Sequence, residues 1–259
     1  MMRALYAEWT KLRTIAGTGW LLLAVVALTV GAGAAAAATV SCPSTGCRYD
    51  AVKVSLMGVQ VSQAVVAILA VLAITGEYGT GMARTTFAAV PRRVTVLLAK
   101  AAALTGLVLV AGTVAVLLSV LCGWLILPGN GFTAAHGYPA LLSLADGATL
   151  RAVVGSVLYL ALVGLLSLGV ATAVRDSATA IGIVLGLLYV VSALPFMVSD
   201  PDWQLLLWRI SPMNAGLAVQ ATANLAAQPL SPWAGLGVLA AWAAAALLTG
   251  GWLLHRRDA

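Results

Sequence analysis

The sequence predicts an all-α integral membrane protein with six transmembrane helices, and its composition, run lengths and charge placement each favour this fold. Of its 259 residues, 62% are hydrophobic and only 8% are charged, against roughly 25% charged in a soluble domain. The mean hydropathy is +1.02. A bilayer core about 30 Å thick needs roughly 20 mostly apolar residues per helix. Helices are expected because backbone groups in lipid must form hydrogen bonds within their own segment.

Uncharged, mostly apolar runs of this length occur six times. We predict one domain over residues 1–259 with spans at 18–40, 54–76, 96–127, 152–174, 177–199 and 233–254. The turn that starts at Pro128-Gly129 ends the third run. This composition excludes a soluble enzyme, a disordered chain and a nucleic-acid binder. Three cysteines are too few for a disulfide scaffold or a multi-cysteine metal site.

The distribution of charges predicts the topology. Six spans place both termini on one side, and that side then carries ten basic residues, Lys100 among them, and four acidic ones, against four of each on the other side. The basic excess makes the first side cytoplasmic, so we predict a multi-pass protein of the plasma membrane with both termini in the cytoplasm. Residues 1–42 also resemble a signal peptide, but the apolar run is long for one and five more spans follow, which favours an uncleaved anchor.

Several shorter segments flank the spans. Residues 2–13 read as an interfacial amphipathic helix, with a frayed tail as the alternative. In the outer segment 199–232, apolar spacing predicts one helix over Asp202–Ile210 and a second over Met213–Leu225. Both helices are too short to span. In the first outer loop, Cys42 and Cys47 either form a disulfide or remain two unpaired thiols, and the sequence does not decide between these alternatives.

The sequence lacks the signatures of an energy source. With Lys100 counted among the cytoplasmic bases, we expect no Asp, Glu, His, Lys or Arg within the apolar run of any span, although such a residue is the coupling device of most secondary carriers. None of the three lysines follows a glycine, so there is no phosphate-binding loop. We therefore predict that the chain is not an enzyme, binds no metal or cofactor, and depends on a partner for energy.

The segment that joins spans two and three is the most informative loop. Gly79 and Gly81 permit a tight turn, residues 82–90 contain no helix breaker, and Pro91 ends the run. This pattern predicts a short helix at the cytoplasmic mouth. It serves either as a docking surface for a partner or as a basic loop that touches anionic lipid.

The chain resembles the permease subunits of ABC-2 type exporters, particularly those of actinobacteria, over essentially its whole length. The likeness lies in the turn Gly76-Glu77-Tyr78, the run Gly81-Met82-Ala83-Arg84-Thr85-Thr86, the triplet Pro91-Arg92-Arg93 and the opening Glu8-Trp9-Thr10-Lys11-Leu12. The resemblance implies that the second loop holds a coupling helix that contacts a separate ATPase subunit, and that re-entrant outer helices lie between spans five and six. By the same resemblance, ATP and Mg²⁺ belong to the partner chain, and a second permease bundle, identical or not, completes the transport path. The coupling role falls on Glu77, Tyr78, Gly79, Gly81, Met82, Arg84 and Phe87.

Two groups of residues inside the spans remain open to two interpretations. Gln60 and Gln63 lie one turn apart and either line a wet path or form hydrogen bonds across helices. Ala178, Gly182 and Gly186 form a row of small residues that serves either internal packing or a dimer interface. The function predicted is the permease half of an ATP-driven exporter for a hydrophobic or amphipathic cargo such as a drug, antibiotic, peptide or lipid. The alternatives are a non-transporting membrane scaffold or assembly protein and, less favoured, a secondary carrier.

Overall fold

The computed structural model describes residues 2–43, 47, 49–79, 93–138 and 142–257. The described residues form helices and connecting segments without any strand. The helices are α1 (Met2–Thr14), α2 (Ala16–Thr39), α3 (Ala51–Ser55), α4 (Gly58–Gly79), α6 (Arg93–Ile126), α7 (Gly147–Val174), α8 (Ser177–Leu185), α9 (Val191–Ala193), α10 (Pro201–Ile210), α11 (Pro212–Leu217) and α12 (Pro232–Arg257).

The prediction of an all-helical membrane protein with six spans is confirmed at the level of helix length and composition. Within the described residues, six stretches are long and apolar enough to cross a membrane: Ala16–Thr39, Gly58–Glu77, Val94–Asn130, Gly147–Val174, Ser177–Phe196 and Pro232–Arg256. The third begins earlier than the predicted residue 96, because α6 starts at Arg93 and continues as an unbroken helix for 34 residues.

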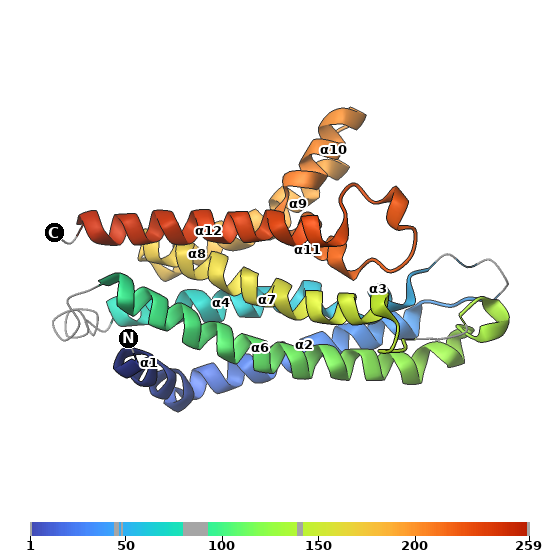
Figure 1. Ribbon diagram of the computed structural model, residues 1–259, viewed down its shortest axis with the longest axis horizontal. Coiled ribbons are helices and arrows are strands. Elements are labelled where there is room, and N and C mark those ends of the chain that lie inside the picture. The colour runs from blue at the N-terminus through green and yellow to red at the C-terminus, as the bar shows by residue number, and fades with distance from the viewer. Residues whose placement is uncertain (1, 44–46, 48, 80–92, 139–141, 258–259) are drawn as a thin grey trace.

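The spans form a bundle with two distinct ends (Figure 1). At one end lie α1, the end of α4, the start of α6, the α7–α8 turn and the end of α12; we call this the terminal end, because both described chain ends lie there. At the opposite end lie the loop after α2, the short helix α3, and α11; we call this the loop end. An even number of spans requires this arrangement of the termini.

The bundle is organised around α7 and α4, which are the most buried of the six spans, whereas α2 and α12 are the least buried. α7 packs against α4, α6 and α12, and α2 packs against α4 and α6. Glycines allow the closest approaches. A Cβ at Gly58 would lie 1.9 Å from the Thr29 carbonyl oxygen of α2, and one at Gly169 would lie 2.5 Å from the Ala246 backbone of α12. Any larger residue at either position would push two spans apart.

The fifth span is not a uniform helix. It runs through α8, a π-helical turn over Gly186–Val190, α9 and a 3₁₀ turn over Leu194–Phe196. Asp176 caps the start of α8 through the Thr179 backbone N–H, and Arg175 adopts a left-handed conformation with φ 65° that reverses the chain after α7. A π turn marks a place where the helical hydrogen-bond ladder changes register, and the sequence pattern did not indicate it.

The segment between the fifth and sixth spans contains the two expected helices with one boundary corrected. α10 (Pro201–Ile210) agrees with the predicted first helix, begins with an Asp200 cap, contains no buried residue and projects from the bundle (Figure 1). The second helix was predicted to reach Leu225. Instead α11 ends at Leu217, and a 3₁₀ turn over Ala218–Gln220 leads into extended backbone at Ala221. The early end lets the backbone after Gln220 meet Asp50 at the loop end.

Candidate functional site

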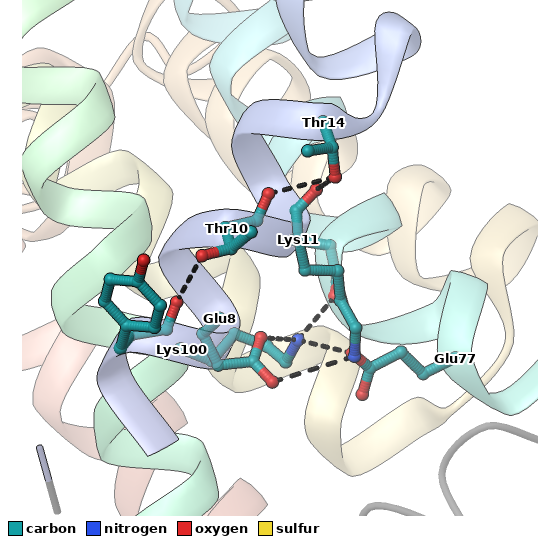
Figure 2. A network of polar contacts seen from close by, with 8 residues as sticks. Glu8, Thr10, Lys11, Thr14, Glu77 and Lys100 are labelled. Atoms are coloured by element: carbon teal, nitrogen blue, oxygen red, sulfur yellow. Dashed lines mark hydrogen bonds and ion pairs between the residues drawn. The ribbon is translucent and has the colours of Figure 1, made fainter. Parts of the chain in front are cut away.

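The terminal end holds a compact group of four charged side chains from three helices, which we call the four-charge cluster: Glu8 and Lys11 of α1, Glu77 of α4 and Lys100 of α6 (Figure 2). The Lys100 ammonium lies at the centre. Its Nζ donates to Glu8 Oε2 at 2.6 Å, to Glu77 Oε1 at 2.9 Å and to the Ala73 carbonyl oxygen at 3.0 Å. One lysine thus connects α6 with both α1 and α4.

The second base of the cluster joins the same two acids. Lys11 Nζ lies 2.5 Å from Glu77 Oε1 and 3.8 Å from Glu8 Oε1. Two carboxylates and two ammonium groups balance, so the cluster has no net charge when all four are ionised. Along α1, the Thr10 hydroxyl donates to the Tyr6 carbonyl and the Thr14 hydroxyl to the Thr10 carbonyl, which keeps both hydroxyls outside the cluster.

The cluster is buried. Lys100 is 1% exposed, Glu8 4% and Glu77 7%, while Lys11 lies at the edge. Charges removed from water are tolerated only when they are paired, and removing one partner of a buried pair costs about 3–5 kcal/mol. The ion pairs of the cluster therefore hold α1 against the end of α4 and the start of α6 as long as all four groups are present.

The expectation that no span contains an ionisable residue was wrong. The candidate span Val94–Asn130 contains Lys100, and the candidate span Gly58–Glu77 ends with Glu77. The charge count treated Lys100 as a solvated cytoplasmic base. Because α6 begins at Arg93, Lys100 lies two turns inside the helix, where its side chain is buried and its ammonium reaches two carboxylates.

The structure describes only some of the predicted coupling residues. Glu77 belongs to the four-charge cluster, and Tyr78 and Gly79 are the last residues of α4. Gly81, Met82, Arg84 and Phe87 lie outside the described residues. Glu8, Lys11 and Lys100 were not among the candidate site residues. The signal that points to them is a lysine close to the start of a long apolar run, together with an acid and a base three residues apart on a short amphipathic helix.

The two glutamines proposed for the transport path have different environments. Gln63 is fully buried; its Oε1 accepts a hydrogen bond from the Tyr159 hydroxyl and its Nε2 lies 2.9 Å from Met213 Sδ. It therefore bonds across helices. Gln60, one turn earlier, lines a cavity at the loop end. Gln63 thus fits the interpretation of hydrogen bonds across helices, whereas the wet path proposed for Gln60 stays a prediction.

The two cysteines of the first outer loop form a disulfide, with 2.10 Å between the sulfurs of Cys42 and Cys47. The loop is fixed further by Asn130, whose Nδ2 donates to the Ala37 carbonyl at 2.8 Å and whose own carbonyl accepts from Cys42 N. Cys122 is a free cysteine. Of the two possibilities that the sequence left for this loop, the structure contains the bonded pair.

No protein-family model matches this chain, and no curated protein matches it significantly. The function must therefore be inferred from the geometry of the four-charge cluster and of the bundle around it.

Proposed function

We propose that the chain is the transmembrane permease subunit of an ATP-driven exporter of the ABC-2 type, with ATP hydrolysed by a separate subunit. The four-charge cluster is the observation that carries this proposal. Glu77 precedes the segment 80–92 by three residues and Lys100 follows it by eight, and the two side chains are joined at 2.9 Å. Both flanks of the proposed coupling segment are thus tied to each other and to α1.

This arrangement suits the transmission of force. A displacement of the segment 80–92 would move the ends of α4 and α6 together, because separating Glu77 from Lys100 would break a buried ion pair. α1 would follow through Glu8 and Lys11. The proposed consequence is a concerted tilt of spans two and three that changes access to a hydrophobic or amphipathic cargo.

A second permease bundle, identical or not, completes the proposed transport path. The small-residue row on the fifth span supports such a partner: within the described residues, a Cβ at Gly182 or Gly186 would meet nothing within 4 Å. Neither glycine is therefore closely packed against another described part of the chain. Small residues allow close approach of helices in lipid, so the open row suits a neighbouring bundle in the membrane.

Co-purification from the native host tests the proposal. We expect a stoichiometric ATPase subunit that is lost when Met82→Asp is introduced and retained in the control Met197→Asp, which places the same charge on an exposed methionine at the other end of the bundle. If the Met82→Asp protein keeps the ATPase, or the wild-type protein never carries one, the exporter proposal is wrong and a scaffold is favoured.

Lys100 supports a second candidate, a proton-coupled secondary carrier. Ionisable residues buried inside a span mark proton and ion pathways in many carriers, and Lys100 lies within a candidate span. Proteoliposomes that contain this chain alone separate the two functions. Uptake of an amphipathic dye driven by a pH gradient without ATP, and abolished by Lys100→Met, would favour the carrier. Absence of uptake until the ATPase subunit and ATP are added would favour the exporter.

A further inference from the structure

A cavity of about 330 Å³ opens at the loop end, between α4, α9, α10 and α11. This volume lies at the lower end of the range for sites that hold a drug-sized ligand, roughly 300–1,000 Å³. It is formed by segments from three separate parts of the sequence, α3–α4, α9–α11 and the segment before α12. The cavity lies at the opposite end of the bundle from the four-charge cluster.

One part of the lining is apolar and adaptable. Phe196 and Trp208 meet edge to face with ring centroids 5.6 Å apart, and Met57 and Met213 also line the cavity. Aromatic rings offer rigid apolar walls, and methionine side chains adjust to the shape of a ligand. This part of the cavity suits a flexible hydrocarbon or aromatic body.

The polar part of the lining includes one positively charged donor. Lys53 is the only charged residue among the described residues that line the cavity. Its ammonium makes no hydrogen bond or ion pair with any described residue, and neither do the side-chain amides of Gln60 and Gln228. The nearest acid in sequence, Asp50, is engaged elsewhere: its carboxylate accepts from the backbone N–H groups of Thr222 and Ala223 at 2.5 and 3.0 Å.

We propose that this cavity binds a single-chain amphipathic anion. The head group, a carboxylate, sulfonate or phosphate ester, pairs with the Lys53 ammonium and accepts hydrogen bonds from the two free amides. The apolar body lies against the Phe196–Trp208 pair and the methionines. Among the described residues, a lining with one cation and no carboxylate favours an anion over a neutral or cationic ligand, and the small volume favours one chain over a two-chain phospholipid. Binding does not depend on transport, whereas identifying the ligand as the cargo rests on the proposed function.

Three photoreactive probes with one apolar body test this proposal: a diazirine-labelled decanesulfonate, decanol and decylammonium. The full chain is reconstituted in nanodiscs of phosphatidylcholine, and the labelled peptides are mapped by mass spectrometry. We expect the sulfonate to label peptides that contain Met57, Trp208 or Met213 at about tenfold lower concentration than the other two probes, because a hydrogen bond to a charged group is stronger than a neutral one.

Substitutions identify the contribution of each part of the cavity. Lys53→Gln should weaken labelling by the sulfonate about tenfold and leave decanol unchanged. Lys53→Arg should restore labelling by the sulfonate, and Arg256→Gln, which removes an exposed cation at the terminal end, should have no effect. Trp208→Ala should weaken all three probes, with thermal unfolding measured to show that the protein is folded.

The following results would overturn the proposal: labelling by decylammonium as efficient as by the sulfonate, an unchanged response in Lys53→Gln, or loss of cavity labelling when phosphatidylglycerol replaces part of the phosphatidylcholine. The last result would assign the cavity to a two-chain lipid of the bilayer. All of these measurements use the chain without an ATPase, so their outcome is independent of the co-purification experiment.

Discussion

The two ends of the bundle are held together by different chemistry. At the terminal end, four long charged side chains join α1, α4 and α6 through ion pairs. At the loop end, a disulfide closes the first outer loop, and side chains form hydrogen bonds with backbone groups. Asp50 accepts from the backbone of Thr222 and Ala223, and the Arg151 guanidinium donates to the Ala221 carbonyl at 2.6 Å.

This difference indicates which end can move. Ion pairs between long side chains join helices to one another without fixing the path of the backbone, so the joined helices can shift as a group. A disulfide and hydrogen bonds to the backbone fix the path of the chain itself. The terminal end is therefore suited to transmitting a displacement, and the loop end is suited to holding the wall of the cavity in place.

Breaking the four-charge cluster should have the largest effect on stability. Lys100→Met removes the ammonium that donates to both Glu8 and Glu77, so two buried carboxylates lose a charged donor. We expect a loss of about 3–5 kcal/mol, measured as a lower Tm of the purified protein in detergent. The matched control Lys53→Met removes an exposed lysine at the loop end and should change stability by no more than about 0.5 kcal/mol.

A compensating variant makes this prediction sharper. In the double variant Glu8→Gln/Lys100→Met, one acid and one base are removed together, so the remaining Lys11 and Glu77 balance. The double variant should have a higher Tm than Lys100→Met alone. A double variant that is less stable than either single variant would show that the four groups do not interact as a charge-balanced unit.

Breaking the Asp50 hydrogen bonds should cause the next largest loss of stability. Asp50→Ala removes the acceptor for the backbone N–H groups of Lys53, Thr222 and Ala223 and for the Thr222 hydroxyl. We expect a loss of about 2–3 kcal/mol, since hydrogen bonds to a charged group contribute roughly 1.5–3 kcal/mol each and water replaces part of them. Hydrogen exchange should become faster at residues 222–223 and remain unchanged in α1. The control Asp202→Ala, at an exposed acid of α10, should leave exchange at 222–223 unchanged.

Opening the disulfide should lower the free energy of unfolding by a smaller amount, because the two cysteines are separated by only five positions. The loop-closure relation gives about 2 kcal/mol for a loop this short. Addition of a phosphine reductant should lower the Tm of the wild-type protein and of Cys122→Ser by the same amount and should not change the Tm of Cys42→Ser/Cys47→Ser. If the reductant lowered the Tm of the double variant by the same amount, its effect on the wild-type protein would not come from the Cys42–Cys47 disulfide.

The spans could be predicted from the sequence because hydropathy over about 20 residues is a local property. α10 was also predictable, since Pro201, the Asp200 cap and the apolar spacing lie within eleven residues. The end of α11 at Leu217 and the π turn in the fifth span were not predictable. Both depend on contacts with other helices, and no residue at these positions forbids a regular α-helix.

The four-charge cluster was missed for a related reason. A topology rule counts charges on each side of the membrane but does not pair them, and Glu8 and Lys100 are 92 residues apart. Glu77 was selected only through the resemblance of the Gly76-Glu77-Tyr78 turn to a family. Lys53 is one of the four bases that the charge count places on the outer side, and its place in the cavity wall depends on where α10 and α11 fold back.

The smallest expected effect concerns two aspartates that occupy matching places at the two ends. Asp176 caps α8 at the terminal end, and its pKa lies below the ordinary value because the hydroxyl and the backbone N–H of Thr179 donate to its carboxylate. Asp146 caps α7 at the loop end, where the backbone N–H and hydroxyl of Thr149 lower the pKa of Asp146 in the same way. If the difference between the two ends comes from the ion pairs and the disulfide and not from the helix caps, acid should weaken the two aspartate caps by the same amount.

A carboxyl group whose pKa is lowered by folding stabilises the protein above its unfolded pKa, and this stabilisation is lost as the pH falls through the lower, folded pKa. Asparagine also caps helices but does not titrate in this range. The Tm of the wild-type protein minus that of Asp176→Asn should therefore be larger at pH 6 than at pH 3. Both proteins contain the same buried carboxylates, so the titration of those groups cancels in this difference. Asp146→Asn should give the same small difference. A difference that grows toward pH 3 for either variant would contradict the cap assignment at that end.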